Sequence, residues 1–230
     1  MPREVEIEER MKPHFIAMFT VTSLVASVAL GDIYVDPTGD IATGNSNLDI
    51  TQVEVTDNGA DLFVSMTLAD LDADWGKYMI FMDAWDGGSG DNDNPWGRDI
   101  GGLGGMDMFA GAWLDGAFGG VIGHEYSNGG WDAMFFATTL SIDWATNTIH
   151  FSFSNLVVGL SSIGITGLDF EVATTGGGSG DPAIDLLGGQ GGNWGEGSTG
   201  AWTYYEFSTV PAPGALALLM MAGIGRRRRS

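Results

Sequence analysis

The chain of 230 residues carries 30 acidic and nine basic residues, which gives a formal net charge of −21, and it contains no cysteine. The missing cysteine excludes disulfide bonds, thiolate-bound zinc and iron–sulfur clusters, and the acidic balance excludes the basic footprint that nucleic-acid binding requires. A charged fraction of only 17% together with 37 glycines disfavours a helical protein and favours many short strands joined by turns.

The N-terminal segment has the three parts of a secretory signal peptide. Basic residues precede a mostly apolar, uncharged stretch over residues 15–30, and the small residues Ala29 and Gly31 stand where a signal peptidase cuts. We therefore expect residues 1–31 to form a helical signal peptide that exports the protein, with Met11 as an alternative start. The other interpretation of the same pattern is a buried N-terminal helix.

Apolar side chains recur at every second position in the middle of the chain, for example over residues 62–68 and 149–153. This alternation is typical of strands with one face on a core. Turn-forming sequences rich in Asn and Gly separate the alternating segments. Nine strands are predicted, over residues 48–56, 61–68, 77–84, 106–114, 120–127, 132–142, 148–157, 168–174 and 201–208. The pattern predicts an all-β domain over residues 32–209, folded as a two-sheet antiparallel β-sandwich of the jelly-roll-like kind.

Three glycine-rich stretches, residues 87–105, 176–180 and 188–200, interrupt the strand pattern. Long loops on a rigid sandwich are where binding residues usually lie. We therefore expect these loops to carry the functional residues, while a disordered spacer is the alternative for residues 188–200.

Tryptophans, several of them in loops, are the candidate ligand-binding residues. The chain has eight tryptophans, several beside Gly or Asp, and indole faces stack on sugar rings while nearby polar groups bind the hydroxyls. Arg98 is one of only two basic residues between residues 32 and 209, which points to a role in the same place. The predicted ligand-binding residues are Trp85, Trp96, Arg98 and Trp113. The alternative is that each tryptophan fills the core or the base of a loop.

A structural Ca²⁺ is the candidate cofactor, because clustered aspartates supply the oxygen ligands that this ion prefers. One cluster lies with two asparagines in the first glycine-rich loop, and the other follows the predicted signal peptide. The predicted metal ligands are Asp91, Asp93, Asp36 and Asp40. Asp181 or Asp185 would complete the second cluster if the start of the domain closes against its last loop. The alternative for both clusters is an ordinary Asx turn.

No catalytic motif stands out in the middle of the chain. A glycosidase needs two carboxylates on either side of the scissile bond, and nothing in the sequence selects one pair from the many acids. His124 and His150 do not form a zinc-binding motif, and no G-x-S-x-G sequence marks a hydrolase. We therefore expect a protein that is not an enzyme.

The C-terminal segment, residues 210–230, combines a proline-containing break, an apolar stretch over residues 214–225 and a basic end. By the positive-inside rule the basic end stays on the cytoplasmic side of a membrane. The residues of this pattern are Pro211, Pro213, Arg226, Arg227, Arg228 and Arg229. The segment is expected to form a short apolar helix.

This C-terminal pattern resembles the PEP-CTERM sorting signal of Gram-negative and related bacteria. The resemblance implies export through the inner membrane, an exosortase-type processing enzyme as partner, and a place at the cell surface or in the extracellular matrix. The sequence departs from the family at Ala212, where the family usually has Glu. The alternative is a plain C-terminal membrane anchor.

The middle of the chain resembles the DOMON-like sandwiches, which include the family-nine carbohydrate-binding modules. The resemblance lies in an Asp-rich opening over residues 36–40, a strand pair joined by Asn58-Gly59, and the strand that ends at Asp83. It implies a jelly-roll-like sandwich that binds sugar or stands beside such binders.

These observations predict a surface- or matrix-associated, non-catalytic protein that binds carbohydrate through loop tryptophans with the support of Ca²⁺. The predicted partners are polysaccharide, the membrane at the C-terminal segment, and the processing enzyme. A purely structural component of the envelope or extracellular polymer is the alternative, and a glycan-active enzyme is the third possibility.

Overall fold

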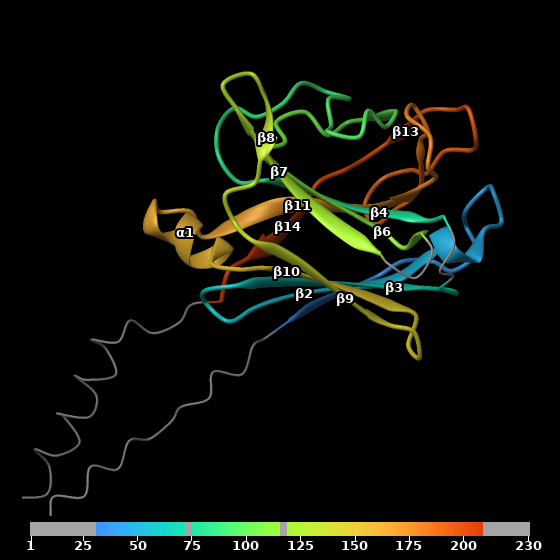
Figure 1. The fold of residues 1–230 in the computed structure, drawn as a ribbon, viewed down its shortest axis with the longest axis horizontal. Helices are drawn as coiled ribbons and strands as arrows, with labels where there is room; N and C mark the ends of the chain where they lie inside the picture. Colours follow the sequence, from blue (N-terminus) through green and yellow to red (C-terminus); the bar gives the residue numbers. More distant parts are fainter. Residues whose placement is uncertain (1–30, 72–74, 116–118, 209–230) are drawn as a thin grey trace, which may run out of the picture.

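The alternating segments of the sequence form two antiparallel sheets that face each other across an apolar core, as the two layers in Figure 1 show. The structure is a computed structural model that describes residues 31–71, 75–115 and 119–208. It confirms the predicted all-β, two-sheet antiparallel sandwich. Residues 1–30 of the predicted signal peptide lie outside the described residues, and so does the C-terminal segment with Pro211, Pro213 and Arg226 to Arg229.

The first sheet has five strands in the order β1-β2-β3-β10-β9. Their bounds are β1 Asp32–Val35, β2 Ile50–Asp57, β3 Leu62–Leu68, β9 Thr138–Asp143 and β10 Thr148–Phe153. Both hairpins of this sheet, β2–β3 and β9–β10, close at turns that the sequence predicts, because Asn58-Gly59 and Thr146-Asn147 follow alternating apolar residues.

The second sheet has seven strands, six of them in the order β12-β11-β4-β6-β7-β8, while β14 also pairs with β11. Their bounds are β4 Lys77–Asp83, β6 Met108–Trp113, β7 Gly120–Ser127, β8 Gly130–Ala133, β11 Gly167–Thr175, β12 Ala183–Leu186 and β14 Thr203–Glu206. A short parallel pair, β5 (Ile100–Gly101) with β13 (Ser198–Thr199), joins two of the long loops.

The main core lies between the sheets and is filled from both of them. In β3 every second residue is buried, as the sequence pattern predicts. Aromatic and aliphatic side chains from the first sheet, such as Phe151 and Phe153, meet Ile80 and Tyr78 from the second. A short 3-10 helix, η1 (Ser46–Leu48), adds Leu48, which is fully buried.

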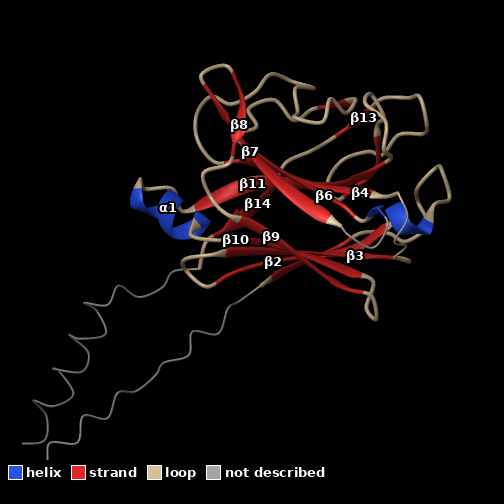
Figure 2. Ribbon diagram, viewed as in Figure 1, coloured by secondary structure: helices blue, strands red, loops and turns tan. Residues whose placement is uncertain are grey.

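A second, smaller core lies on the outer face of the second sheet. Its residues are Met79, Phe81, Ile100, Leu103, Met106, Phe109, Ala173, Ala183 and Leu186. The glycine-rich loops lie over this face, where Figure 2 shows them gathered above β4 and β6. Burial on both faces explains why five consecutive residues of β4 are buried instead of alternating.

Two predicted strands differ from the structure. The predicted strand 132–142 is divided into β8 and β9, which belong to different sheets. The predicted strand 148–157 ends at Phe153, and a helix, α1 (Leu156–Ser162), follows at one end of the sandwich (Figure 1). Among the residues that the structure describes, no helix has the length and apolar character needed to cross a membrane.

Candidate ligand-binding site

The outer face of the second sheet carries a row of large side chains beside the second core. The strand register places Lys77 of β4 opposite Trp113 of β6, and Trp113 opposite Gly120 of β7. In the next row on the same face, Gly111 lies opposite Ile122. Side chains two residues apart share one face of a sheet, so these positions form one continuous surface.

Two glycines on this surface leave space for indole rings. A Cβ atom at Gly111 would overlap the ring of Trp96, and one at Gly120 would overlap the ring of Trp113. Neither glycine has a positive φ angle, so backbone conformation does not require glycine at these positions. Close approach of the rings requires it instead.

The loop after β4 positions Trp96 and Arg98 above the sheet through a tight turn. The Asn94 side chain donates to the Arg98 carbonyl at 2.9 Å and accepts from the Arg98 backbone N–H at 2.9 Å. Gly97 provides the left-handed residue of the turn, with φ 59°. The Trp96 ring packs edge-on against Phe109, with centroids 5.2 Å apart. These contacts hold the loop that carries the two candidate residues against the sheet.

Arg98 is a buried cation with free hydrogen-bond donors. Its side chain is 5% exposed, and no residue in the described part of the chain accepts a hydrogen bond from its Nε or Nη1. Its guanidinium carbon lies 5.7 Å from the centroid of the Trp96 ring. Burial lowers the pKa of Arg98, and the negative charge of Asp181 opposes that shift. Because unsatisfied buried donors are costly, this side chain is suited to a ligand that supplies acceptor oxygens.

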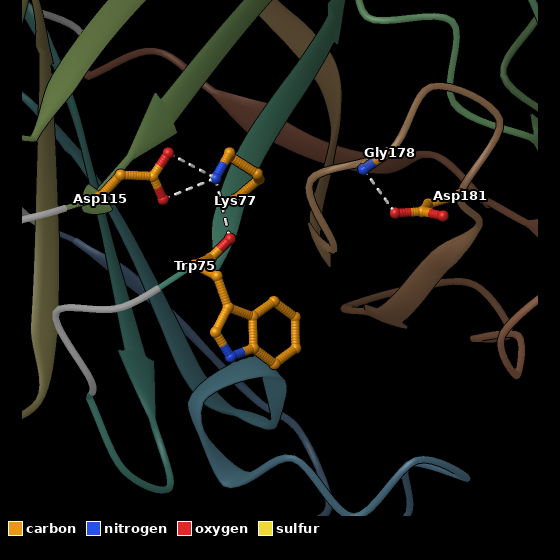
Figure 3. A network of polar contacts seen from close by, with 5 residues as sticks. All are labelled: Trp75, Lys77, Asp115, Gly178 and Asp181. Atoms are coloured by element: carbon orange, nitrogen blue, oxygen red, sulfur yellow. Dashed lines mark hydrogen bonds and ion pairs between the residues drawn. The ribbon is translucent and has the colours of Figure 1, made fainter.

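Lys77 lies on the same surface, opposite Trp113, and is held by its own contacts (Figure 3). Its Nζ donates to Asp115 at 2.9 Å, which is the one salt bridge among the described residues, and to the Trp75 carbonyl at 2.8 Å. Figure 3 also shows Asp181 on a separate loop, where it accepts from the Gly178 backbone N–H at 2.7 Å. Lys77 is therefore paired directly with a carboxylate, whereas Arg98 forms no salt bridge among the described residues and has only the more distant charge of Asp181.

These side chains surround one hollow of about 520 Å³, which we call the tryptophan pocket. It is lined by Lys77, Trp96, Arg98, Trp113, Asp115, Ile122, Gly177 and Ser179. The structure thus brings together three of the four predicted ligand-binding residues, Trp96, Arg98 and Trp113. No sequence pattern selects Lys77, Asp115 or Ser179 as ligand-binding residues. Lys77 stands out in the sequence as one of two basic residues between residues 32 and 209. The residues that lie beside it follow only from the strand register.

Trp85 lies apart from the other predicted ligand-binding residues. It lines a different hollow with Asp83, Asp86 and Asp169, and its side chain is 36% exposed. Its backbone N–H donates to Asp107 at 2.8 Å. The structure therefore does not assemble the four predicted residues into one site.

Beside Trp85, Asp83 and Asp107 form a carboxyl pair that no sequence pattern indicates. The Asp107 carboxylate accepts from the backbone N–H groups of Ala84 and Trp85, both at 2.8 Å. Burial, followed by the charge of Asp107, raises the pKa of Asp83 to about 7, and burial also raises the pKa of Asp107. One proton shared between the two carboxyls is the arrangement that this environment favours.

Asp91 and Asp93 are exposed and engage different partners. Asp91 accepts from the Gly102 backbone N–H at 2.6 Å, and Asp93 accepts from the indole N–H of Trp131 at 3.3 Å. Between them, Asn92 has a left-handed conformation with φ 60°. Neither bond is the local one of an Asx turn, in which a side chain accepts from the backbone two residues on. Both reach residues further along the chain, and the two aspartates do not form a group of three metal-ligating side chains in the described ranges.

Asp36 and Asp40 lie close to Asp185 of β12, which we call the carboxylate cluster. One oxygen from each of the three side chains lies within 4.8 Å of those of the other two. Burial raises the pKa of Asp36 and of Asp185 to about 7, and neighbouring carboxylates add to both shifts. No other group of three or more metal-ligating side chains occurs in the described ranges. The prediction had left open whether Asp181 or Asp185 completes this cluster, and the structure places Asp185 there.

Comparisons with known proteins do not assign the chain to a family. No family model matches it, and no curated protein matches it either. The resemblances to PEP-CTERM proteins and to DOMON-like sandwiches therefore stay predictions.

Proposed function

We propose that this protein is exported and held at the cell surface or in the extracellular matrix, where it binds carbohydrate in the tryptophan pocket without catalysing a reaction. The observation that carries the proposal is the convergence on one hollow of two partly accessible indoles and a buried arginine whose Nε and Nη1 have no hydrogen-bond partner in the described residues. Export and retention rest on the sequence pattern of the two ends of the chain.

The exposure of the tryptophans supports binding over a purely packing role. None of the eight is fully buried, and all eight fall within the described ranges. Trp96 and Trp113 each present part of an indole to the hollow while resting on the sheet beneath. Such a rigid aromatic surface suits the apolar face of a sugar ring.

The polar residues of the pocket suit the hydroxyl groups of a sugar. Arg98, Asp115 and Ser179 bring N–H donors and oxygen acceptors to the lining of the hollow. A few well-placed polar groups around an apolar surface are typical of small-ligand sites. Asp115 is the only carboxylate among the lining residues that the structure describes, which supports binding over glycoside hydrolysis, since that reaction uses a carboxylate pair.

Affinity electrophoresis and co-sedimentation with a panel of neutral and uronate-containing polysaccharides test this proposal. We expect the full chain to bind at least one polysaccharide and Trp113→Ala to weaken that binding at least tenfold, or about 1.4 kcal/mol. Trp144→Ala is the matched control, because Trp144 is 47% exposed and follows β9 in the other sheet. The Trp144→Ala variant should bind the polysaccharide with the affinity of the unchanged chain.

Thermal unfolding of each variant separates a lost contact from a lost fold, and Trp113→Phe keeps an aromatic ring if the alanine variant unfolds. If the folded chain is retained on no polysaccharide, or if the control loses as much affinity as Trp113→Ala, the proposal is wrong. Absence of all binding would favour the structural role in the envelope or extracellular polymer.

A further inference from the structure

We infer that the carboxylate cluster of Asp36, Asp40 and Asp185 binds one Ca²⁺, which fastens the segment after β1 to strand β12. The inference is independent of carbohydrate binding, because none of the three residues lines the tryptophan pocket. It rests on the spacing of the carboxylates, on an unpartnered buried oxygen, and on the lack of a compensating cation.

The spacing fits a single ion. Ca²⁺ binds oxygen at about 2.4 Å, so two oxygens on opposite sides of the ion lie about 4.8 Å apart. The three carboxylate oxygens of the cluster all lie within 4.8 Å of one another. The three side chains therefore lie close enough together for one ion to bind all of them.

Asp36 gives a second, independent observation that points to a bound cation. Its side chain is 7% exposed, yet its Oδ2 is buried and has no hydrogen-bond partner in the described part of the chain. A buried carboxylate oxygen without a partner is costly. A cation between Asp36 and Asp185 would remove that cost.

No positive side chain takes this role within the described ranges. The one salt bridge found there joins Lys77 to Asp115, and Arg98 lies in the tryptophan pocket with Lys77. Asp185 is itself 4% exposed, and its two oxygens accept only backbone N–H groups, from Ile50 at 2.6 Å and Leu186 at 2.9 Å. Asp36 and Asp185 are thus buried carboxylates of the cluster, and neither forms a salt bridge among the described residues.

The donor set selects the kind of ion. All three side chains are carboxylates, and the wall of the same hollow adds the amide of Gln190 and a glycine-rich backbone. Oxygen-only ligands favour hard cations, whereas zinc and copper sites usually include histidine or cysteine. Mg²⁺ demands near-ideal octahedral geometry and retains its waters, so an irregular loop with buried carboxylates favours Ca²⁺.

Calorimetric titration and thermal unfolding of the chelator-treated full chain test the site, with CaCl₂, MgCl₂ and NaCl of matched ionic strength as the probes. We expect Ca²⁺ to raise the unfolding temperature, and Asp40→Asn to weaken Ca²⁺ binding at least tenfold. Asp40 is exposed and makes no hydrogen bond in the described structure, so this variant should fold.

Asp36→Asn gives a sharper readout, because its effect on the unfolding temperature should have opposite signs with and without Ca²⁺. In chelator the variant should unfold at the same or a higher temperature than the unchanged chain, since a repelling charge is removed. In Ca²⁺ it should unfold at a lower temperature, since a ligand is lost. A carboxylate with a packing role alone would give the same sign in both conditions.

Asp93→Asn is the matched control, because it removes one exposed aspartate from the other candidate cluster. Its response to Ca²⁺ should equal that of the unchanged chain. The inference is overturned if Ca²⁺ does not raise the unfolding temperature, or if Asp93→Asn changes the response as much as Asp40→Asn does. Equal shifts with Mg²⁺ at the same concentration would overturn the assignment to Ca²⁺.

Discussion

At the scale of single residues, the glycines beneath the indoles determine where the tryptophan pocket forms. A methyl group at Gly111 would overlap the Trp96 ring, so the ring must move away from the sheet. We expect Gly111→Ala to lower the free energy of unfolding by about 1–3 kcal/mol through overpacking and to weaken carbohydrate binding. Gly130→Ala is the control, because nothing lies within 4 Å of its Cβ position. Denaturant unfolding and affinity electrophoresis of both variants would measure the effects, and equal results for the two would contradict this prediction.

Residue counts predict part of the tryptophan pocket but not its boundaries. Arg98 was identified in the sequence because basic residues are rare in this domain, and that reasoning applies equally to Lys77. Trp85 was grouped with Trp96 because the two are near in sequence. The two indoles nevertheless line separate hollows. Proximity in sequence is a weak guide within a long loop.

At the scale of elements, a single buried carboxylate ties β2 to the last strand. Asp57, at the end of β2, is fully buried and accepts from the Tyr205 hydroxyl at 2.8 Å and from the Ser208 backbone N–H at 2.7 Å. Hydrogen bonds to charged groups contribute about 1.5–3 kcal/mol. We expect Tyr205→Phe to lower the free energy of unfolding by about that amount, measured by denaturant titration.

Tyr204→Phe is the neighbouring control for that prediction. The Tyr204 side chain is 55% exposed, and its hydroxyl makes no hydrogen bond in the described part of the structure. Its loss should change stability by less than about 0.5 kcal/mol. A Tyr205→Phe variant as stable as this control would show that the Asp57 contact does not hold β2 and β14 together.

Periodicity predicts strands well where one face is buried, and it fails where an element changes partners. Met134, Phe136 and Leu140 continue one alternating pattern from β8 into β9 and pack on the main core throughout. The pattern does not show that β8 pairs in the second sheet and β9 in the first. It therefore predicts a single strand over residues 132–142. β12 has four consecutive buried residues and thus no alternation to detect. Helix α1 has only seven residues, too few to establish a helical period.

At the scale of the whole molecule, the glycine-rich loops are a packed third layer and not spacers. Residues 188–200 were expected to be either a binding loop or a disordered segment. In the structure Gln190 and Thr199 exchange backbone hydrogen bonds, at 2.7 and 3.1 Å, and the Gly200 N–H donates to the Gly101 carbonyl at 2.8 Å. The second core was not predictable from single segments, because its residues come from loops and strands distant in sequence.

Buried carboxyls also give the whole molecule an unusual dependence on pH. The pKa values of Asp83 and Glu171 are raised to about 7, mainly by burial, from ordinary values near 4. The folded chain therefore binds these protons more tightly than the unfolded chain does, and stability falls as the pH rises from about 4 to about 7. In chelator, we expect a higher denaturant midpoint at pH 5.5 than at pH 7.5.

Asp83→Asn tests the contribution of the carboxyl pair to this pH dependence. Asp107 accepts two backbone N–H groups and so favours the ionised form, which leaves Asp83 as the member that carries the proton. An amide at residue 83 can donate to Asp107 at any pH, so the variant should gain stability at pH 7.5 and show a smaller difference between the two pH values. Asp93→Asn, which removes an equal charge from an exposed position, should keep the full difference. A wild-type midpoint that is higher at pH 7.5 would contradict the direction argued here, because it would require the unfolded chain to hold these protons more tightly than the folded one.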